Sequence, residues 1–144
     1  MSAAAETAAL SSARRAGVVL VAATILSILA MAHHPSVGSH DASAAIAEIG
    51  AKATLGRLVH GVLIALIGLE LWALTVFAER IRGARDAVRA GSIAYAIGVG
   101  AMIGAALISG FVVTRLAAQY AEDGADPATF ASLAQLAMTG NQAL

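Results

Sequence analysis

Two long apolar stretches constrain this chain more than any other feature of its sequence. They run from Leu58 to Ala78 and from Gly91 to Val113, with few polar side chains inside them. At about 1.5 Å of rise per residue, a helix of either length crosses the hydrocarbon core of a bilayer, which is about 30 Å thick. A third apolar run covers Ala16 to Ala32. The sequence therefore predicts an all-α protein, a polytopic transmembrane helical bundle of about three spans.

The composition agrees with a protein that is solvated mainly by lipid. Hydrophobic residues make up 59% of the 144 residues and charged residues only 12%, a balance outside the range of water-soluble domains. Nine basic residues balance nine acidic ones and form no basic patch, so we expect no nucleic-acid partner. Cysteine is absent, which excludes disulfides and thiolate metal sites. The expected partners are the lipid bilayer and either other membrane subunits or further copies of the chain.

The distribution of lysine and arginine predicts the orientation of the spans in the membrane. Six arginines fall on one side of the membrane, whereas Lys52, Arg57 and Arg115 fall on the other. Because positive residues concentrate on the cytoplasmic side, we expect an inner-membrane protein with a mobile, cytoplasmic amino-terminal tail at 1–15. The expected helices cover about 16–32, 57–79 and 90–114, with an outer loop at 33–56 and a cytoplasmic loop at 80–89. Within the outer loop, residues 43–53 have the apolar spacing of a short interfacial helix.

The first apolar run has a second interpretation. Arg14 and Arg15 precede it, and the small-residue triplet from Ala30 to Ala32 ends it. This is also the layout of a secretory signal peptide that is cleaved before His33. The loop that follows lies outside the cytoplasm under either interpretation.

The carboxy-terminal part, 115–144, is expected to hold an acidic link and an amphipathic helix. Asp126 suits the N-cap of that helix and Pro127 its first position. From Asn141 onward the residues resemble the start of another helix, so the pattern is consistent with a further span. Four apolar residues share one face of the amphipathic helix and favour a position at the membrane surface: Phe130, Leu133, Leu136 and Ala137.

Glycines are frequent in the third predicted span. Gly100 and Gly104 are four residues apart, as are Ala106 and Gly110. Small residues at this spacing let helices approach closely in lipid. We expect them to serve packing within the chain.

Histidines form the one group of residues that indicates a specific chemistry. His33 and His34 follow the first span, His60 lies one turn inside the second, and His40 precedes Asp41 in the loop between them. Imidazole and carboxylate groups bind Zn²⁺, Cu²⁺ or Ni²⁺, so these five residues are a candidate metal site. Their spacing matches no standard metal motif. Ordinary interfacial polar residues are the alternative interpretation.

A single haem b is a more specific version of the same site. If the first two spans are antiparallel, His33 or His34 reaches the depth of His60, as bis-histidine ligation requires. Arg57 is then close enough to pair with a haem propionate. No histidine falls on the cytoplasmic side, which excludes electron transfer between two haems across the membrane.

Glu70 is the second candidate functional residue. It lies midway along the second span among leucines and isoleucines. A charged side chain there costs about 2.5–3.5 kcal/mol on insertion scales. We therefore expect Glu70 to be protonated or paired inside the bundle, either as a proton or cation relay or as a packing contact.

Together these patterns predict a small integral membrane binding or accessory subunit with an outer-face metal or haem site. No hydrolase, kinase or transferase motif occurs in the sequence, so an enzyme is the less favoured class. Two alternatives remain at this point: a minimal proton- or cation-coupled transporter centred on Glu70, and a membrane redox subunit with one haem.

Overall fold

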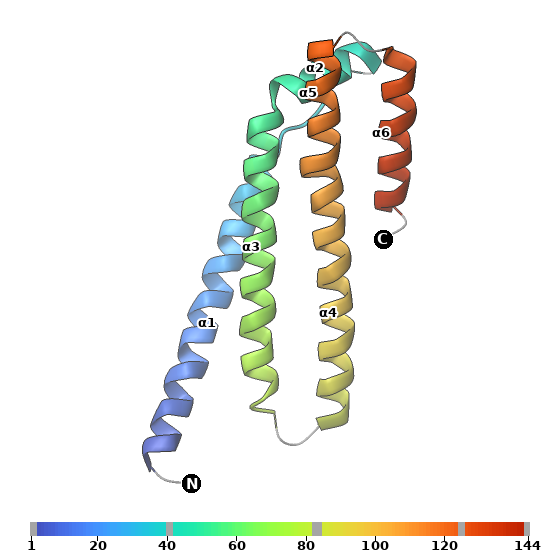
Figure 1. Ribbon diagram of the computed structural model, residues 1–144. Coiled ribbons are helices and arrows are strands. Elements are labelled where there is room, and N and C mark those ends of the chain that lie inside the picture. The colour runs from blue at the N-terminus through green and yellow to red at the C-terminus, as the bar shows by residue number, and fades with distance from the viewer. Residues whose placement is uncertain (1–2, 40–41, 82–84, 124–125, 143–144) are drawn as a thin grey trace.

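The computed structural model is a helical bundle, and it describes residues 3–39, 42–81, 85–123 and 126–142. Three long helices run along the molecule, and short helices gather at one end of it (Figure 1). No strand occurs within these ranges. In chain order the elements are α1 (Ala3–Ala32), α2 (Ala42–Ala51), α3 (Ala53–Ala78), α4 (Arg85–Leu107), the π-helix η1 (Ile108–Val113), α5 (Thr114–Asp123) and α6 (Pro127–Gln142).

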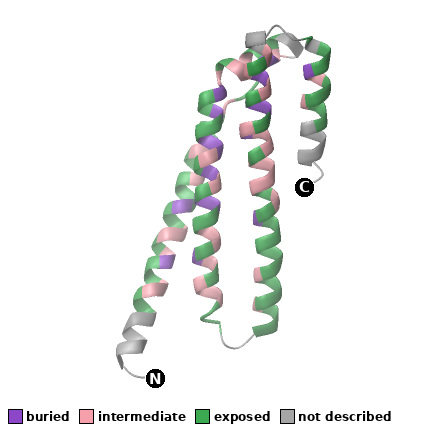
Figure 2. Ribbon diagram, viewed as in Figure 1, coloured by how far each residue is buried: buried purple, intermediate pink, exposed green. Residues whose placement is uncertain are grey.

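Three helical segments are long and apolar enough to cross a membrane, which confirms the predicted transmembrane bundle. They are Leu10–Ala32, Ala53–Ala78 and Arg85–Tyr120. Helix α3 is central, because both α1 and α4 pack against it (Figure 1). Many residues of the three helices are exposed (Figure 2), and they include many large apolar side chains. A continuous apolar surface of this kind is typical of contact with a membrane.

Residues from Ala3 onward form helix, so most of the predicted tail at 1–15 belongs to the first helix. Helix α1 begins at Ala3 instead of Ala16. The stretch before Ala16 is rich in alanine, the best helix former, and contains neither Gly nor Pro. A helix nucleated in the apolar span therefore extends into it. There the Arg80 guanidinium donates to the Ser12 hydroxyl oxygen at 2.7 Å, which joins this part of α1 to the end of α3.

The third span also extends beyond its predicted limits of 90–114. Helix α4 begins at Arg85, and after η1 the helix continues as α5 to Asp123. The first part of the predicted acidic link is therefore helical. No Gly or Pro occurs from Phe111 to Asp123 to stop the helix.

A small hydrophobic cluster closes the bundle where α2, α5 and α6 meet. Ile46, Ala117 and Phe130 are buried there, and the ring centroids of Tyr120 and Phe130 are 5.5 Å apart. We refer to this end of the bundle as the capped end. The short helix expected in the loop at 33–56 is present as α2, and it packs against α5.

Helix α6 begins as its sequence predicts. The Asp126 carboxylate accepts a hydrogen bond from the backbone N–H of Ala128 and another from the hydroxyl of Thr129, both at 3.2 Å. Asp126 is therefore the N-cap of the helix.

The rest of α6 differs from the expected surface helix. It runs back beside η1 and the adjoining part of α4 instead of lying across the capped end (Figure 1). Phe130 is buried, whereas Leu133 and Leu136 are exposed. The side chain of Ala137 lies outside the described residues. Packing of the described apolar face is thus concentrated at the start of the helix.

Candidate functional site

His34 and His60 face each other near the capped end. Their Nε2 atoms are 3.3 Å apart, and their rings meet edge to face with centroids 4.8 Å apart. His60 is buried on α3, whereas His34 is exposed in the turn that follows α1. The antiparallel packing of α1 against α3 brings the two residues to the same depth.

A hydrogen bond to its own helix fixes the ring of His60. Its Nδ1 donates to the carbonyl oxygen of Gly56 at 2.8 Å. Because a carbonyl only accepts, Nδ1 carries the proton of the neutral ring. The lone pair of Nε2 is then directed at His34. A backbone carbonyl behind a histidine is a usual outer support of a metal ligand.

Ser109 adds a third polar atom at the same point. Its hydroxyl oxygen is 3.2 Å from His60 Nε2. The hydroxyl also donates to the carbonyl oxygen of Ala105 at 2.7 Å. The position of the serine oxygen is thus set by α4.

The π-helix η1 brings its backbone directly against His60. A Cβ atom at Gly110 would overlap the Cβ and Cγ atoms of His60, so the close approach requires glycine. The hydroxyl of Thr114 donates to the carbonyl oxygen of Gly110 at 2.6 Å. Short π-helical turns are frequent at functional sites.

Gly98 and Gly100 have a different environment from Gly110. A Cβ at Gly98 or Gly100 would meet no neighbouring atom within 4 Å. The packing within the chain that was expected at Gly100 is therefore not found there, whereas Gly110 is in close contact with α3.

Two charged side chains tie the turn after His34 to the following helix. Lys52 Nζ donates to the carbonyl oxygen of Ser36 at 2.9 Å and pairs with Glu48 Oε1 at 2.7 Å. Glu48 Oε2 accepts from the backbone N–H of Gly38 at 3.0 Å. The hydrogen bond from Lys52, followed by that from Gly38, lowers the pKa of the Glu48 carboxyl. These contacts form a clamp that holds the turn in place.

Although His34 is largely exposed, partial loss of water around its ring lowers its pKa, and the positive charge of protonated His60 lowers it further. A hydrogen bond to the backbone of Pro35 opposes both effects in part. His34 therefore stays neutral to lower pH than a free histidine, whose pKa is about 6.5. A neutral imidazole is the form that binds a metal ion.

Cavities lie on both sides of the histidine pair. One of 170 Å³ adjoins the turn and is lined by Pro35, Lys52 and Thr114 as well as the two histidines. The other, of 340 Å³, extends from the pair along α3. At its far end the Ser27 hydroxyl donates to Glu70 Oε1 at 3.3 Å, so Glu70 has the partner inside the bundle that its position predicts.

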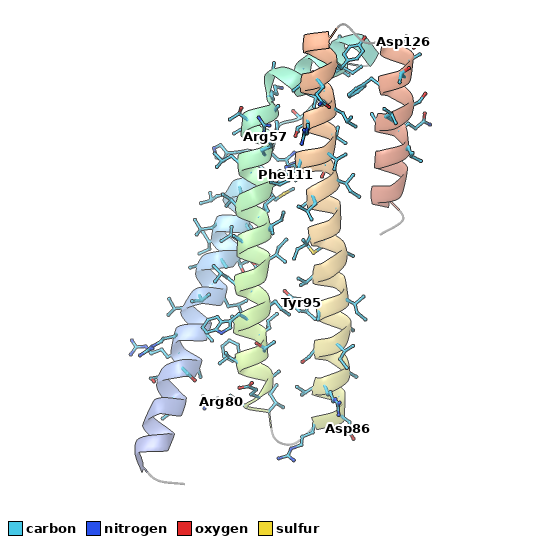
Figure 3. The ribbon with its side chains drawn as sticks, in the orientation of Figure 1. Arg57, Arg80, Asp86, Tyr95, Phe111 and Asp126 are labelled. Atoms are coloured by element: carbon cyan, nitrogen blue, oxygen red, sulfur yellow. The ribbon has the colours of Figure 1, made fainter. Side chains whose placement is uncertain are left out.

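The remaining predicted site residues are not brought to the pair. His33 Nδ1 donates to the carbonyl oxygen of Leu29 at 2.8 Å, and its side chain is exposed. Arg57 is exposed on α3 (Figure 3). Neither residue lines the two cavities beside the pair. The predicted ligands His40 and Asp41 lie outside the described residues.

The arrangement does not fit a haem held between His34 and His60. Bis-histidine ligation places the macrocycle between the two imidazoles. Here the two Nε2 atoms are 3.3 Å apart and the rings are in contact, which leaves no layer for it. The geometry therefore gives no support to the haem alternative.

Comparison of the chain with protein families, with curated proteins and with solved structures gives no significant match. Within the described part of the chain, no cluster of three or more His, Cys, Asp or Glu residues has the geometry of a metal site. The described protein groups at the pair are thus two imidazoles and one hydroxyl. They can donate nitrogen lone pairs to a cation or share a proton.

Proposed function

We propose that this chain is a small integral membrane protein that binds a transition-metal ion between His34 and His60. The observation that carries the proposal is the 3.3 Å separation of the two Nε2 atoms. Nitrogens that lie about 2.0–2.1 Å from a tetrahedral metal ion are about 3.3–3.4 Å from each other. The pair can therefore accept an ion with little movement of either ring.

The two histidines have different parts in this site. His60 is the fixed ligand, because the Gly56 carbonyl orients its ring. His34 is the second ligand, held by the turn that Lys52 and Glu48 clamp. Two protein nitrogens leave two positions of a tetrahedral ion for water or another ligand, one more than in open zinc sites with three protein ligands. The Ser109 hydroxyl is placed to hydrogen-bond such a ligand. An open site of this kind suits a binding or accessory role.

Metal binding should weaken as the pH falls from about 7.5 to about 5.5, because ligating imidazoles must be deprotonated. The pKa of His34 is lowered. Protonation of His34 should therefore weaken binding at a pH below the ordinary histidine pKa of about 6.5. Calorimetric titration of the purified protein with Zn²⁺ or Cu²⁺ at a series of pH values measures this. If no saturable binding of one ion per chain is found at the upper pH, the proposal is wrong.

We further propose that the histidine pair lies at the outer face of an inner membrane. Arg80 and Asp86 lie at the end of the bundle opposite to Arg57 and Asp126 (Figure 3). The end that carries Arg80 is the arginine-rich one, and it is the cytoplasmic end under the positive-inside rule. The amino terminus is then cytoplasmic as well, because α1 starts at that end (Figure 1).

A reporter that is active only in the periplasm tests this orientation. Fused after Ala47, in α2, it should give a signal, and fused after Ile81, at the end of α3, it should give none. A matched reporter that is active only in the cytoplasm should give the opposite result. The reverse pattern for both reporters would place the histidine pair on the cytoplasmic side.

A further inference from the structure

The larger cavity beside the histidine pair has the size and lining of a small-molecule site. It measures 340 Å³ and lies between α1, α3 and α4. Sites for small ligands measure about 300–1,000 Å³ and combine a mainly apolar lining with a few placed polar groups. The apolar lining here comes from all three helices: Met31, Leu63, Ile67, Met102, Ala105 and Ala106.

The polar groups of this lining lie at its two ends. His34, His60 and Ser109 form one end, and Ser27 and Glu70 form the other. His60 and Glu70 are ten positions apart on α3, which corresponds to about 15 Å along the helix axis. The space between them is lined by aliphatic and thioether side chains.

Glu70 has no cationic partner among the described residues. Ser27 donates to one of its carboxylate oxygens, Oε1. No Lys or Arg lines the cavity. A charged carboxylate at this depth carries a cost of about 2.5–3.5 kcal/mol on insertion scales. A bound cation would offset that cost.

The cavity is accessible from the lipid. Met31 and Met102, which line it, are 56% and 57% exposed. Helices α1 and α4 each pack on α3 and make no contact with each other in the described part of the chain (Figure 1). A ligand dissolved in the bilayer can enter between them without passing the histidine pair.

We propose that this cavity binds a lipophilic organic cation, with its charged group at Glu70 and its apolar body along Leu63 and Ile67. Ca²⁺ and Mg²⁺ fit this end poorly, because they take six or more oxygen ligands and the end offers one carboxylate and one hydroxyl. An organic cation brings its own apolar surface to the remaining lining. This activity is separate from the metal binding proposed above.

Benzyltrimethylammonium is a suitable probe, and neopentylbenzene is its uncharged isostere. In lipid nanodiscs with a chelator present, we expect saturable binding of one benzyltrimethylammonium per chain and no saturable binding of neopentylbenzene. Glu70→Gln, which keeps the shape of the side chain, should weaken binding at least tenfold. Glu79→Gln is the matched control, because Glu79 is an exposed carboxylate near the end of α3 that does not line this cavity. It should change the affinity less than twofold.

Three results would overturn the proposal: no saturable binding of the cation, equal binding of the isostere, or equal affinity in Glu70→Gln. The comparison of the two probes uses the parent protein and decides the question even if Glu70→Gln does not fold. Glu70→Gln should also leave the Zn²⁺ titration unchanged. A failure of cation binding is therefore distinguishable from a failure of metal binding.

Discussion

His60→Ala should weaken the binding of Zn²⁺ and Cu²⁺ by at least about 100-fold. Loss of an outer-shell partner alone costs about 10–100-fold in metal affinity, and this substitution removes a ligand itself. His60 is also the better fixed of the two histidines, because it is buried on α3 and its Nδ1 donates to the Gly56 carbonyl. The measurement is a calorimetric titration of parent and variant in the same detergent.

His33→Ala provides the matched control for this experiment. His33 is adjacent to His34 in sequence, but its Nδ1 donates to Leu29 and its side chain lines neither cavity beside the pair. We expect an affinity within about twofold of the parent. If His60→Ala binds metal as the parent does, these histidines are ordinary polar residues near the membrane surface. If His33→Ala alone abolishes binding, the ion is held elsewhere.

Gly110→Ala should destabilise the protein by about 1–3 kcal/mol, the usual cost of overpacking an interior, and should weaken metal binding as well. The added methyl group would overlap the Cβ and Cγ atoms of His60. These atoms lie next to the backbone of α3, so a change of side-chain rotamer does not relieve the overlap. The helices must separate, which moves His60 away from Ser109 and disturbs the position of its ring beside His34. Equilibrium unfolding in a mixed micelle measures the free energy of unfolding.

Gly98→Ala is the control on the same helix. A Cβ there would meet nothing within 4 Å, and alanine is favoured over glycine in a helix by about 0.5–1 kcal/mol. We therefore expect a stability equal to or slightly above that of the parent and unchanged metal affinity. Equal stabilities for Gly110→Ala and the parent would show that η1 does not pack on His60 as described.

The transmembrane bundle could be predicted from the sequence because the apolar run from Leu58 to Ala78 is long enough to decide both element type and span. The expectation that His33 or His34 shares the depth of His60 followed from the same reasoning. Consecutive spans are antiparallel, so residues near the end of one and the start of the next share a depth in the membrane.

The parts that the sequence did not reveal depend on contacts between elements. Gly110 has the spacing of a packing residue, and only the structure shows that His60 is what it packs against. The π-helical turn and the role of Ser109 left no periodic signal, since a single widened turn barely alters an apolar pattern. His33 and His34 are equivalent in sequence. The direction of the chain after α1 decides which of them faces α3.

The unequal anchoring of the two histidines bears on how quickly an ion is exchanged. His60 is held by its own rigid helix, whereas His34 depends on a turn attached through the Lys52–Glu48 ion pair. Both partners of that pair are partly exposed, and dissolved salt screens such pairs. An ion would bind first to Nε2 of His60 and then to Nε2 of His34. The residence time of a bound ion is then governed by the opening of the turn, and this residence time should become shorter as the ionic strength rises.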